Sequence, residues 1–370
     1  MRTYLKYCAG VDVSKDDFHV KLLATDLDVA SEAALGARKF DNTPGGFREF
    51  TAWLDGKCAE RERLTVVMEA TGVYYEALAY ALHEGGLRVS VLLRVSVLLP
   101  NNVKHFIRSF NEHSKTDAID AIAIARFGLR RPLRVWAPFS EGSRGLKLLS
   151  REYQQLETKL TRVRAQLHAA QRTRGGSART MTRLEEQIAF LTEQRRAVDA
   201  ETVALTRADE RLKRAVAVLT SIHGVGAKSA MAILGETDGF GLFETRAQLI
   251  KYAGLDVVYK QSGTSVNAPT KISKKGNRLI RKSLFFPSMR AKERGLFAEV
   301  FARQMRGSGV KMKALVAVQR KLLTTMYALI KKDEMWHEDY HESGAGQTPG
   351  ERAGKVPTPG EQVGAEADLR

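Results

Sequence analysis

The chain has 370 residues, 44% of them apolar, and a formal net charge of +17 at pH 7. That length leaves room for two domains with their own cores, and the excess positive charge favours a polyanionic partner without separating DNA from RNA. The longest apolar stretch, Val89 to Leu99, is interrupted by Arg94 and is too short to cross a bilayer, so we expect no membrane partner.

The two cysteines, Cys8 and Cys58, form neither a metal-binding pair nor a disulfide framework. This cysteine usage fits a reducing cytoplasm. The N-terminus runs quickly into a charged strand pattern, and we therefore expect no secretory signal.

Residues 1 to about 130 alternate strand and helix patterns, which is typical of an α/β domain. The patterns predict strands near 5–13, 18–24, 37–41, 64–69 and 88–93, and helices over 45–55, 74–84, 100–111 and 115–130. The sequence RVSVLL occurs twice in tandem within 88–99, and we interpret this repeat as a neutral duplication.

Four carboxylates in this part of the chain are its most informative feature. Asp12 alternates with Val11 and Val13 in a predicted strand, and Glu69 ends the apolar run LTVVME. Asp117 and Asp120 are three residues apart in a predicted helix, so both acids lie on one helix face.

Grouped carboxylates repel one another unless a cation neutralises them, and their hard oxygen atoms suit Mg²⁺ or Mn²⁺. Two such ions, about 4 Å apart, can hold the attacking and leaving oxygens of a phosphoryl transfer. Each acid alone has a plain structural interpretation, and Asp117 in particular is suited to open its helix. Together, the four acids in an α/β pattern are typical of ribonuclease-H-like nucleases and predict a metal site.

The middle of the chain carries heptad-like apolar stripes. Steps of three and four residues join Leu146, Leu149, Tyr153, Leu156, Leu160, Val163 and Leu167. After the break TRGGSART, a similar stripe joins Leu184, Ile188, Leu191, Val198, Leu205 and Leu212. This pattern predicts a helical hairpin or a pair of coiled-coil arms, and it leaves open whether the partner helix is in the same chain or in a second copy.

From residue 216 a second globular unit begins. Gly224 and Gly226 separate two apolar helical runs in LTSIHGVGAKSAMAILGE, which indicates a helix-hairpin-helix motif or a plain glycine turn. In the first case, the loop amides and Lys228 would hold a backbone phosphate.

A basic segment follows a polar stretch that contains Ser262 and Ser265. Cationic side chains in this segment can neutralise phosphates, and an asparagine can add hydrogen bonds; the candidates are Lys271, Lys274, Lys275, Asn277, Arg278, Arg281 and Lys282. A serine is a weak nucleophile without an activating base or metal, so the local sequence alone favours a phosphate-contacting or turn serine.

Several words of the sequence, taken in order, resemble the DEDD transposases of the insertion-sequence one-ten family, which are bridge-RNA-guided recombinases of bacteria. The matching words are GVDVSKDDFHV, FDNTPGGFREF, VVMEATGVYYEAL, SKTDAIDAIAIA, SIHGVGAKSAMAILGE, YAGL and SGTSV with KISKKGNRLIRKSL. They extend over about residues 4 to 330. The resemblance implies that Ser262, or failing that Ser265, is a catalytic nucleophile.

The resemblance also implies the domain order. We expect an α/β ribonuclease-H-like (RuvC-like) catalytic domain over 1–140, a coiled-coil helical connector over 141–215, and a mainly helical transposase domain over 216–335. The Gly- and Pro-rich residues 336–370 are expected to form a disordered tail.

The expected function is RNA-guided DNA transposition in a bacterial, nucleoid-associated setting. Asp12, Glu69, Asp117 and Asp120 would bind Mg²⁺, Ser262 would form a phosphoserine link to DNA, and a structured bridge RNA would pair with donor and target DNA. The active form would be a homodimer or homotetramer. The alternatives are a RuvC-type junction nuclease, which needs no Ser262, and a non-catalytic nucleic-acid-binding protein.

Overall fold

A five-stranded mixed sheet organises the N-terminal part of the chain. The computed structural model describes residues 4–25, 32–58, 60–69, 72–92, 117–131, 133, 135–262 and 266–337, with the backbone alone for 91–92, 117–118, 259–262 and 266–269. The strands are β1 (Lys6–Val13), β2 (Asp17–Thr25), β3 (Glu32–Asp41), β4 (Leu64–Glu69) and β5 (Arg88–Leu92). The helices near them are α1 (Pro44–Lys57), the short η1 (Arg61–Arg63), α2 (Tyr75–Glu84) and α4 (Asp117–Arg130).

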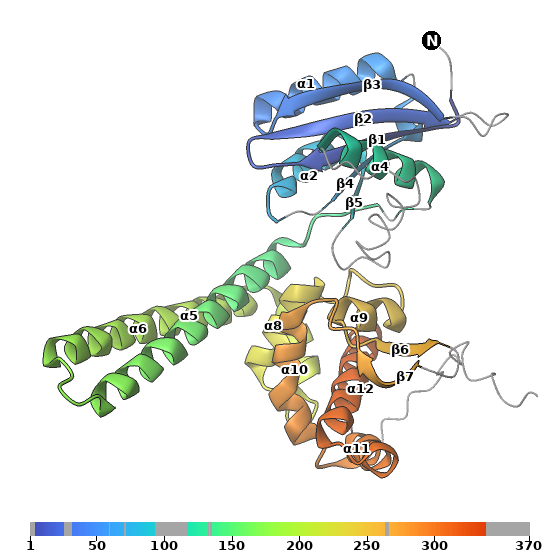
Figure 1. Cartoon of the computed structure of the whole chain (residues 1–370). Helices are drawn as coiled ribbons and strands as arrows, with labels where there is room; N and C mark the ends of the chain where they lie inside the picture. The colour runs from blue at the N-terminus through green and yellow to red at the C-terminus, as the bar shows by residue number, and fades with distance from the viewer. Residues whose placement is uncertain are drawn as a thin grey trace, which may run out of the picture. The chain divides into compact units, whose positions relative to one another are not determined.

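The strand order is β3-β2-β1-β4-β5 (Figure 1). The first three strands are antiparallel neighbours in a meander, whereas β4 and β5 run parallel to β1. A meander joined to parallel strands through β1 is the arrangement of the ribonuclease-H-like fold, so the N-terminal part has the fold class that the sequence predicted.

One face of this sheet carries the main N-terminal core. Alternate residues of β1, such as Tyr7, Ala9 and Val11, pack with Phe50 of α1 and Leu78 of α2, and all five are almost fully buried. Thr43 caps α1 by accepting a hydrogen bond from the amide of Gly46, and Pro44 fits the first helical turn.

Helix α4 covers the opposite face, where Cys8 and Val67 pack with Ile124 and Phe127. Near the end of this helix, Lys6 donates from Nζ to the carbonyl oxygen of Gly128 at 2.6 Å. Cationic groups stabilise the carbonyl-rich end of a helix. Burial raises the pKa of the Cys8 thiol to about 12, so Cys8 is a core residue that carries no thiolate near neutral pH.

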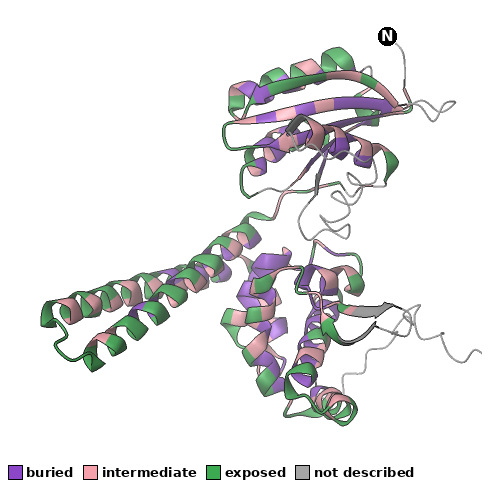
Figure 2. Cartoon of the chain, viewed as in Figure 1, coloured by how far each residue is buried: buried purple, intermediate pink, exposed green. Residues whose placement is uncertain are grey.

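The next two helices, α5 (Glu141–Arg172) and α6 (Ala178–Ala208), pack side by side as a hairpin. Leu149, Leu156 and Val198 are buried between them. No residue from 164 to 197 is buried, so the far half of the hairpin consists of exposed and half-buried residues, as Figure 2 shows.

The apolar stripe predicted for the second helix does not continue in one helix to Leu212. Asp209 ends α6 and caps a separate helix, α7 (Glu210–Thr220), by accepting from the amides of Arg211 and Leu212. The predicted boundary between residues 215 and 216 therefore falls inside α7.

The C-terminal part is mainly helical, with one two-stranded antiparallel hairpin. Its elements are α8 (Ala227–Thr237), α9 (Arg246–Ala253), β6 (Val257–Ser262), β7 (Val266–Ile272), α10 (Arg278–Ala291), α11 (Gly295–Ser308) and α12 (Lys311–Lys332). Helix α12 supplies much of the core, including fully buried Leu322, Leu323 and Met326.

A buried charge cluster joins α8 and the start of α10 to α5. Glu236 of α8 is 1% exposed at its side chain and pairs with Arg151 of α5, with N–O distances of 2.7 and 3.0 Å. Asn277, which precedes α10, donates to the same carboxylate at 2.6 Å. A buried carboxylate needs such partners, because an unpaired charge in the core is strongly destabilising.

Most N-terminal strand and helix predictions are close to the observed elements. The exception is β3, which was predicted to start near 37 and starts at Glu32, since its first half pairs with β2 across a bulge between Leu22 and Leu23. The predicted helix over 100–111, the second RVSVLL copy and residues 338–370 lie outside the described residues. In the described part, no helix is long and apolar enough to span a membrane.

Candidate carboxylate site and serine hairpin

Asp12 and Glu69 lie at the C-terminal ends of two adjacent parallel strands, Asp12 next to last in β1 and Glu69 last in β4. The strand pairing aligns Val11 of β1 with Met68 of β4, and each acid is the next residue of its strand. Residues at equivalent positions of neighbouring strands point to the same face, and adjacent strands lie about 4.8 Å apart. The two acids therefore stand next to each other at one edge of the sheet.

Both acids share the face that α4 covers. Gly10, two residues before Asp12, lies so close to α4 that an added Cβ would come within 3.0 Å of the carbonyl oxygen of Ala121 and the amide nitrogen of Ala125. The alternation of β1 puts Asp12 on this face with Cys8 and Gly10.

The direction of α4 brings its first turn to Asp12. Lys6, at the start of β1, bonds the carbonyl of Gly128 near the end of α4, whereas Gly10, further along β1, lies against Ala121 and Ala125. Helix α4 is therefore antiparallel to β1, and its first turn lies beyond Gly10 in the direction of Asp12. Two further strand residues advance about 6.7 Å, the length of about four helical residues. That step ends at the turn that holds Asp117 and Asp120.

The structure thus brings Asp12, Glu69 and the first turn of α4 to one edge of the sheet. The side chains of Asp12, Glu69 and Asp120 are half-buried, whereas that of Asp117 is outside the described side chains. Among the described side chains, no three acids, histidines or cysteines lie close enough together to hold a metal ion.

His19 is a neighbour of the site that the sequence did not reveal. It stands directly opposite Asp12 in the β1–β2 pairing, so both side chains are on the same face. The strands are joined by the tight turn after Val13, where the backbone of Ser14 bonds that of Asp17. Counting outward from this turn would have paired His19 with Asp12.

Asn42 joins the loops that follow Asp12 and Glu69. Its side-chain amide nitrogen donates to the carbonyl oxygens of Ser14, at 3.0 Å, and Tyr74, at 3.1 Å. Ser14 follows β1 and Tyr74 follows β4, so one amide group connects the two segments that leave the acid-bearing strand ends. We therefore propose Asn42 as a positioning residue for the candidate carboxylate site.

Replacing Asn42 with aspartate is expected to raise the divalent-metal concentration needed for half-maximal DNA strand transfer, and to lower activity by about 10- to 100-fold, as losing an indirect support of a metal ligand does. Aspartate keeps the shape of the side chain but cannot donate to the two carbonyls. Metal titration of the strand-transfer rate provides the measurement.

Thr43→Ala is the matched control, because it removes the neighbouring helix cap at a cost of about 1 kcal/mol without touching either loop. It should lower the melting temperature and leave the metal requirement unchanged. An equal shift of the metal requirement in both variants would reduce Asn42 to a stability residue.

Ser262 is at the far end of the β6–β7 hairpin. It ends β6 and pairs with Val266, the first residue of β7, on either side of residues 263–265. The structure describes the backbone of Ser262, while Ser265 lies outside the described residues. Ser262 is five residues from Val257, a strand length of about 17 Å from the base of the hairpin.

Two of the sequence motifs that carry the family resemblance, YAGL and KISKKGN, are in contact at the base of the hairpin. Tyr252 accepts a hydrogen bond from the amide of Asn277 at 2.7 Å, and Gly254 accepts one from the amide of Lys274 at 3.1 Å. A Cβ on Gly276 would clash with the backbone of Gly254. This tight backbone contact fixes both ends of the hairpin.

The predicted phosphate ligands divide into two groups. Asn277 uses its side-chain oxygen to cap α10 and its nitrogen to bond Glu236, and Arg281 donates to the carbonyl of Ala253 at 2.7 Å. Both therefore have structural roles. The other candidates are exposed on the hairpin, its base and α10, namely Lys271, Lys274, Lys275, Arg278 and Lys282.

Residues of the glycine loop between α7 and α8, and Lys228 after it, also have structural roles. Gly224 has a φ of +87° and lies against α10, where a Cβ would come within 3.0 Å of the Cβ of Arg290. Gly226 precedes α8 and faces open space. Lys228 pairs with Asp199 at 2.9 Å and lies over the ring of Tyr153. Phosphate binding by this loop remains a prediction.

Comparison with known proteins adds two family matches. A model described as "Transposase", for DEDD transposases, matches residues 9–173, and a model described as "Transposase IS116/IS110/IS902 family" matches residues 216–299. The first of these segments contains all four carboxylates, and the second contains Ser262 and the basic segment after it.

Two curated relatives are similar over different lengths. The chain is 26% identical over 343 residues to the pilin gene-inverting protein of Moraxella bovis, which covers 92% of this chain and 99% of that relative. It is 28% identical over 149 residues to the uncharacterized 43.6 kDa protein of insertion element IS110 from Streptomyces coelicolor, which covers 40% of this chain and 36% of that relative.

Among solved structures, the T. thermophilus RuvC in complex with a Holliday junction substrate aligns with 14% identity and a TM-score of 0.27, covering 35% of this chain and 99% of that one. This score is low, so the fold assignment rests on the strand order and not on this match.

Proposed function

Because the chain belongs to the IS110 family of DEDD transposases and is thus a DNA-recombining enzyme, we propose that it mobilises an insertion sequence by RNA-guided DNA cleavage and strand exchange. The observation that carries this proposal is the meeting of Asp12, Glu69 and the first turn of α4 at one edge of the sheet. A surface or capping role for each acid would not require this convergence.

The residues at this edge suit a hard divalent cation. Asp12, Glu69, Asp117 and Asp120 would hold Mg²⁺ or Mn²⁺, which when bound supplies positive charge to the scissile phosphate. Carboxylates crowded at one edge repel each other, and this repulsion favours uptake of a cation. His19, opposite Asp12, would help to orient that carboxylate.

Ser262 would act as the nucleophile. Its Oγ would attack phosphorus, forming a phosphoserine bond while the bond from phosphorus to one DNA oxygen breaks, and the serine proton would leave on that DNA oxygen. The hydroxyl of a second DNA end would then attack the phosphoserine and release Ser262. The number of phosphoester bonds is conserved, so strand exchange needs no ATP.

Assembly of two or more copies would bring Ser262 to the carboxylates. The hairpin formed by β6 and β7 holds Ser262 about 17 Å from its fixed base, a shape suited to reaching into another active site. The exposed half of the α5–α6 hairpin is available for pairing with a second copy. The active form would be a homodimer or homotetramer.

A structured RNA would select the DNA sites by pairing with donor and target, so that base pairing and not side chains reads the sequence. The net charge of +17 supports binding of both RNA and DNA backbones. Sequencing the RNA that co-purifies with the protein would test this part, and recovery of no discrete RNA would contradict it.

Site-specific inversion is a second candidate. It is favoured by the similarity to the pilin gene-inverting protein over 92% of this chain. Inversion and transposition use the same strand exchange and differ in how the DNA sites are oriented. A reporter plasmid with two sites in inverted and in direct orientation would separate the two outcomes.

The carboxylate site is tested by Asp12→Asn in a strand-transfer assay with purified protein, co-purified RNA and DNA. We expect a loss of more than about 100-fold, because even residues that only support metal ligands contribute about 10- to 100-fold. The control is Asp16→Asn, which makes the same charge change in the exposed turn after β1. Wild-type activity of the Asp12→Asn variant would refute the proposed site.

A further inference from the structure

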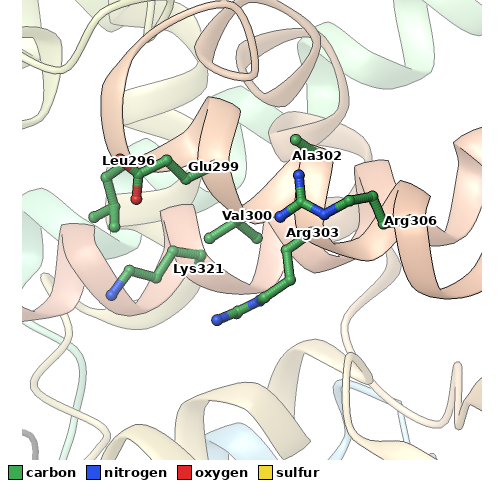
Figure 3. A pocket seen from close by; sticks show the side chains of 7 residues that line it. All are labelled: Leu296, Glu299, Val300, Ala302, Arg303, Arg306 and Lys321. Atoms are coloured by element: carbon green, nitrogen blue, oxygen red, sulfur yellow. The ribbon is translucent and has the colours of Figure 1, made fainter.

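A cationic pocket lies between α11 and α12 and is lined by none of the phosphate ligands considered above. Its volume is about 530 Å³, and Arg303, Arg306 and Lys321 line it together with apolar residues and a single acid, Glu299. Figure 3 shows Val300 between the side chains of Arg303 and Lys321. Sites of this size hold ligands larger than a bare inorganic ion.

The two arginines have no structural role in the described part of the chain, where neither forms a hydrogen bond or ion pair. Arginines with structural roles elsewhere are paired, as Arg151 is with Glu236 and Arg214 is with Asp333. Two unpaired guanidinium groups one helical turn apart are ready to receive oxyanions.

The charge of the surrounding segment reinforces this arrangement. Residues 295–332 contain eight lysines and arginines against one acid, Glu299. An excess of one sign around a hollow surface concentrates the local potential and attracts ligands of the opposite sign.

Helices, not loops, carry the cations of the pocket. Lys321 is followed on α12 by Leu322 and Leu323, which are fully buried, and the first turn of α11 is anchored by the buried Phe297. Cations on such helices lose less conformational freedom on binding than cations on a mobile loop.

We propose that this pocket binds the phosphate backbone of duplex DNA, with Arg303 and Arg306 on neighbouring phosphates and Lys321 beside them. DNA is the occupant because it is the substrate of the family, and because the guanidinium and ammonium groups that line the pocket complement the negative charge of backbone phosphates. The site would hold the DNA in place and leave sequence selection to other parts. This inference rests on the DNA-recombining function of the family.

The test is the salt dependence of non-specific duplex binding by the full chain. Each phosphate contact contributes about 0.9 to the slope of log affinity against log salt. Arg303→Gln, Arg306→Gln and Lys321→Gln together should lower that slope by about 2 to 3 and weaken binding by at least about tenfold at physiological salt.

A charge-matched control removes three exposed cations elsewhere, with Arg48→Gln, Lys57→Gln and Arg172→Gln. It should change the slope by less than about 1, because these residues make no phosphate contact in the proposal. Glu299→Gln provides a test of opposite sign, since removing the only acid of the pocket should tighten DNA binding. Melting temperatures of all variants should match the wild type.

Equal slopes for the pocket and control variants would overturn the proposal, and so would a loss of affinity for an RNA hairpin with none for duplex DNA. A wild-type protein that forms no adduct through Ser262, but shows the pocket-dependent slope, would refute the serine mechanism and leave the DNA pocket standing. The two failures are therefore distinguishable.

Discussion

Replacing Ser262 with alanine is expected to abolish the denaturant-resistant protein–DNA adduct that we expect the wild-type enzyme to form with RNA and a suicide DNA substrate. The change removes the atom that would bond phosphorus, so neither cleavage nor strand exchange should remain above background. DNA binding should weaken by no more than about tenfold, because one neutral hydrogen bond contributes about 1 kcal/mol. Denaturing electrophoresis and peptide mapping of the adduct provide the measurement.

Two further variants decide how a result is interpreted. Ser265→Ala is the neighbouring control and should still form the adduct, whereas Asp12→Asn should form none if the carboxylates and the serine act on the same phosphate. An adduct that maps to Ser265 would move the nucleophile by three residues and keep the mechanism. Clean cleavage by both serine variants, with no adduct in the wild type, would instead favour a junction nuclease.

The sequence predicted the acids and their strands but not how the strands are ordered. Alternation around Asp12 and the apolar run before Glu69 are local patterns, and both were interpreted correctly as strand positions. That β1 and β4 are parallel neighbours, with Val11 beside Met68, depends on contacts between segments more than fifty residues apart. Local patterns do not encode such pairings.

The two residues that sequence reasoning missed differ in how far they could have been predicted. His19 is on the strand that follows a tight turn, and its register with Asp12 follows from that turn. Asn42 bonds Ser14 and Tyr74, which are 28 and 32 residues away. Helix and strand periodicities predict contacts between residues a few positions apart, so they could not have predicted these two hydrogen bonds.

In the C-terminal part, the basic composition predicted that Asn277 binds nucleic-acid phosphates, although a rule for helix ends also applies to this residue. Asparagine directly before a helix is a preferred N-cap, and Asn277 caps α10 through Leu279 and Ile280. Its second role, a hydrogen bond to Glu236, depends on a buried carboxylate 41 residues away. A basic neighbourhood alone therefore does not distinguish a phosphate ligand from a residue with a structural role.

Gly10→Ala is expected to lower both the stability of the N-terminal part and the strand-transfer activity, although it adds only one methyl group. The new Cβ would come within 3.0 Å of the carbonyl oxygen of Ala121 and the amide nitrogen of Ala125, so α4 must move away from β1. Overpacking of this kind costs about 1–3 kcal/mol. Because Asp120 is on the neighbouring turn of α4, and a misplacement of about 1 Å can cost about 100-fold, strand transfer should fall at least that far.

Gly56→Ala is the matched control, because its Cβ would have no neighbour within 4 Å and Gly56 lies in the exposed part of α1. It should raise stability by about 0.4–1 kcal/mol through the unfolded state and leave activity unchanged. The obstacles at Gly10 are backbone atoms, so shortening a side chain on α4 cannot rescue Gly10→Ala. Wild-type melting temperature and strand transfer in Gly10→Ala would show that α4 does not rest on β1 and would remove the argument that places Asp120 beside Asp12.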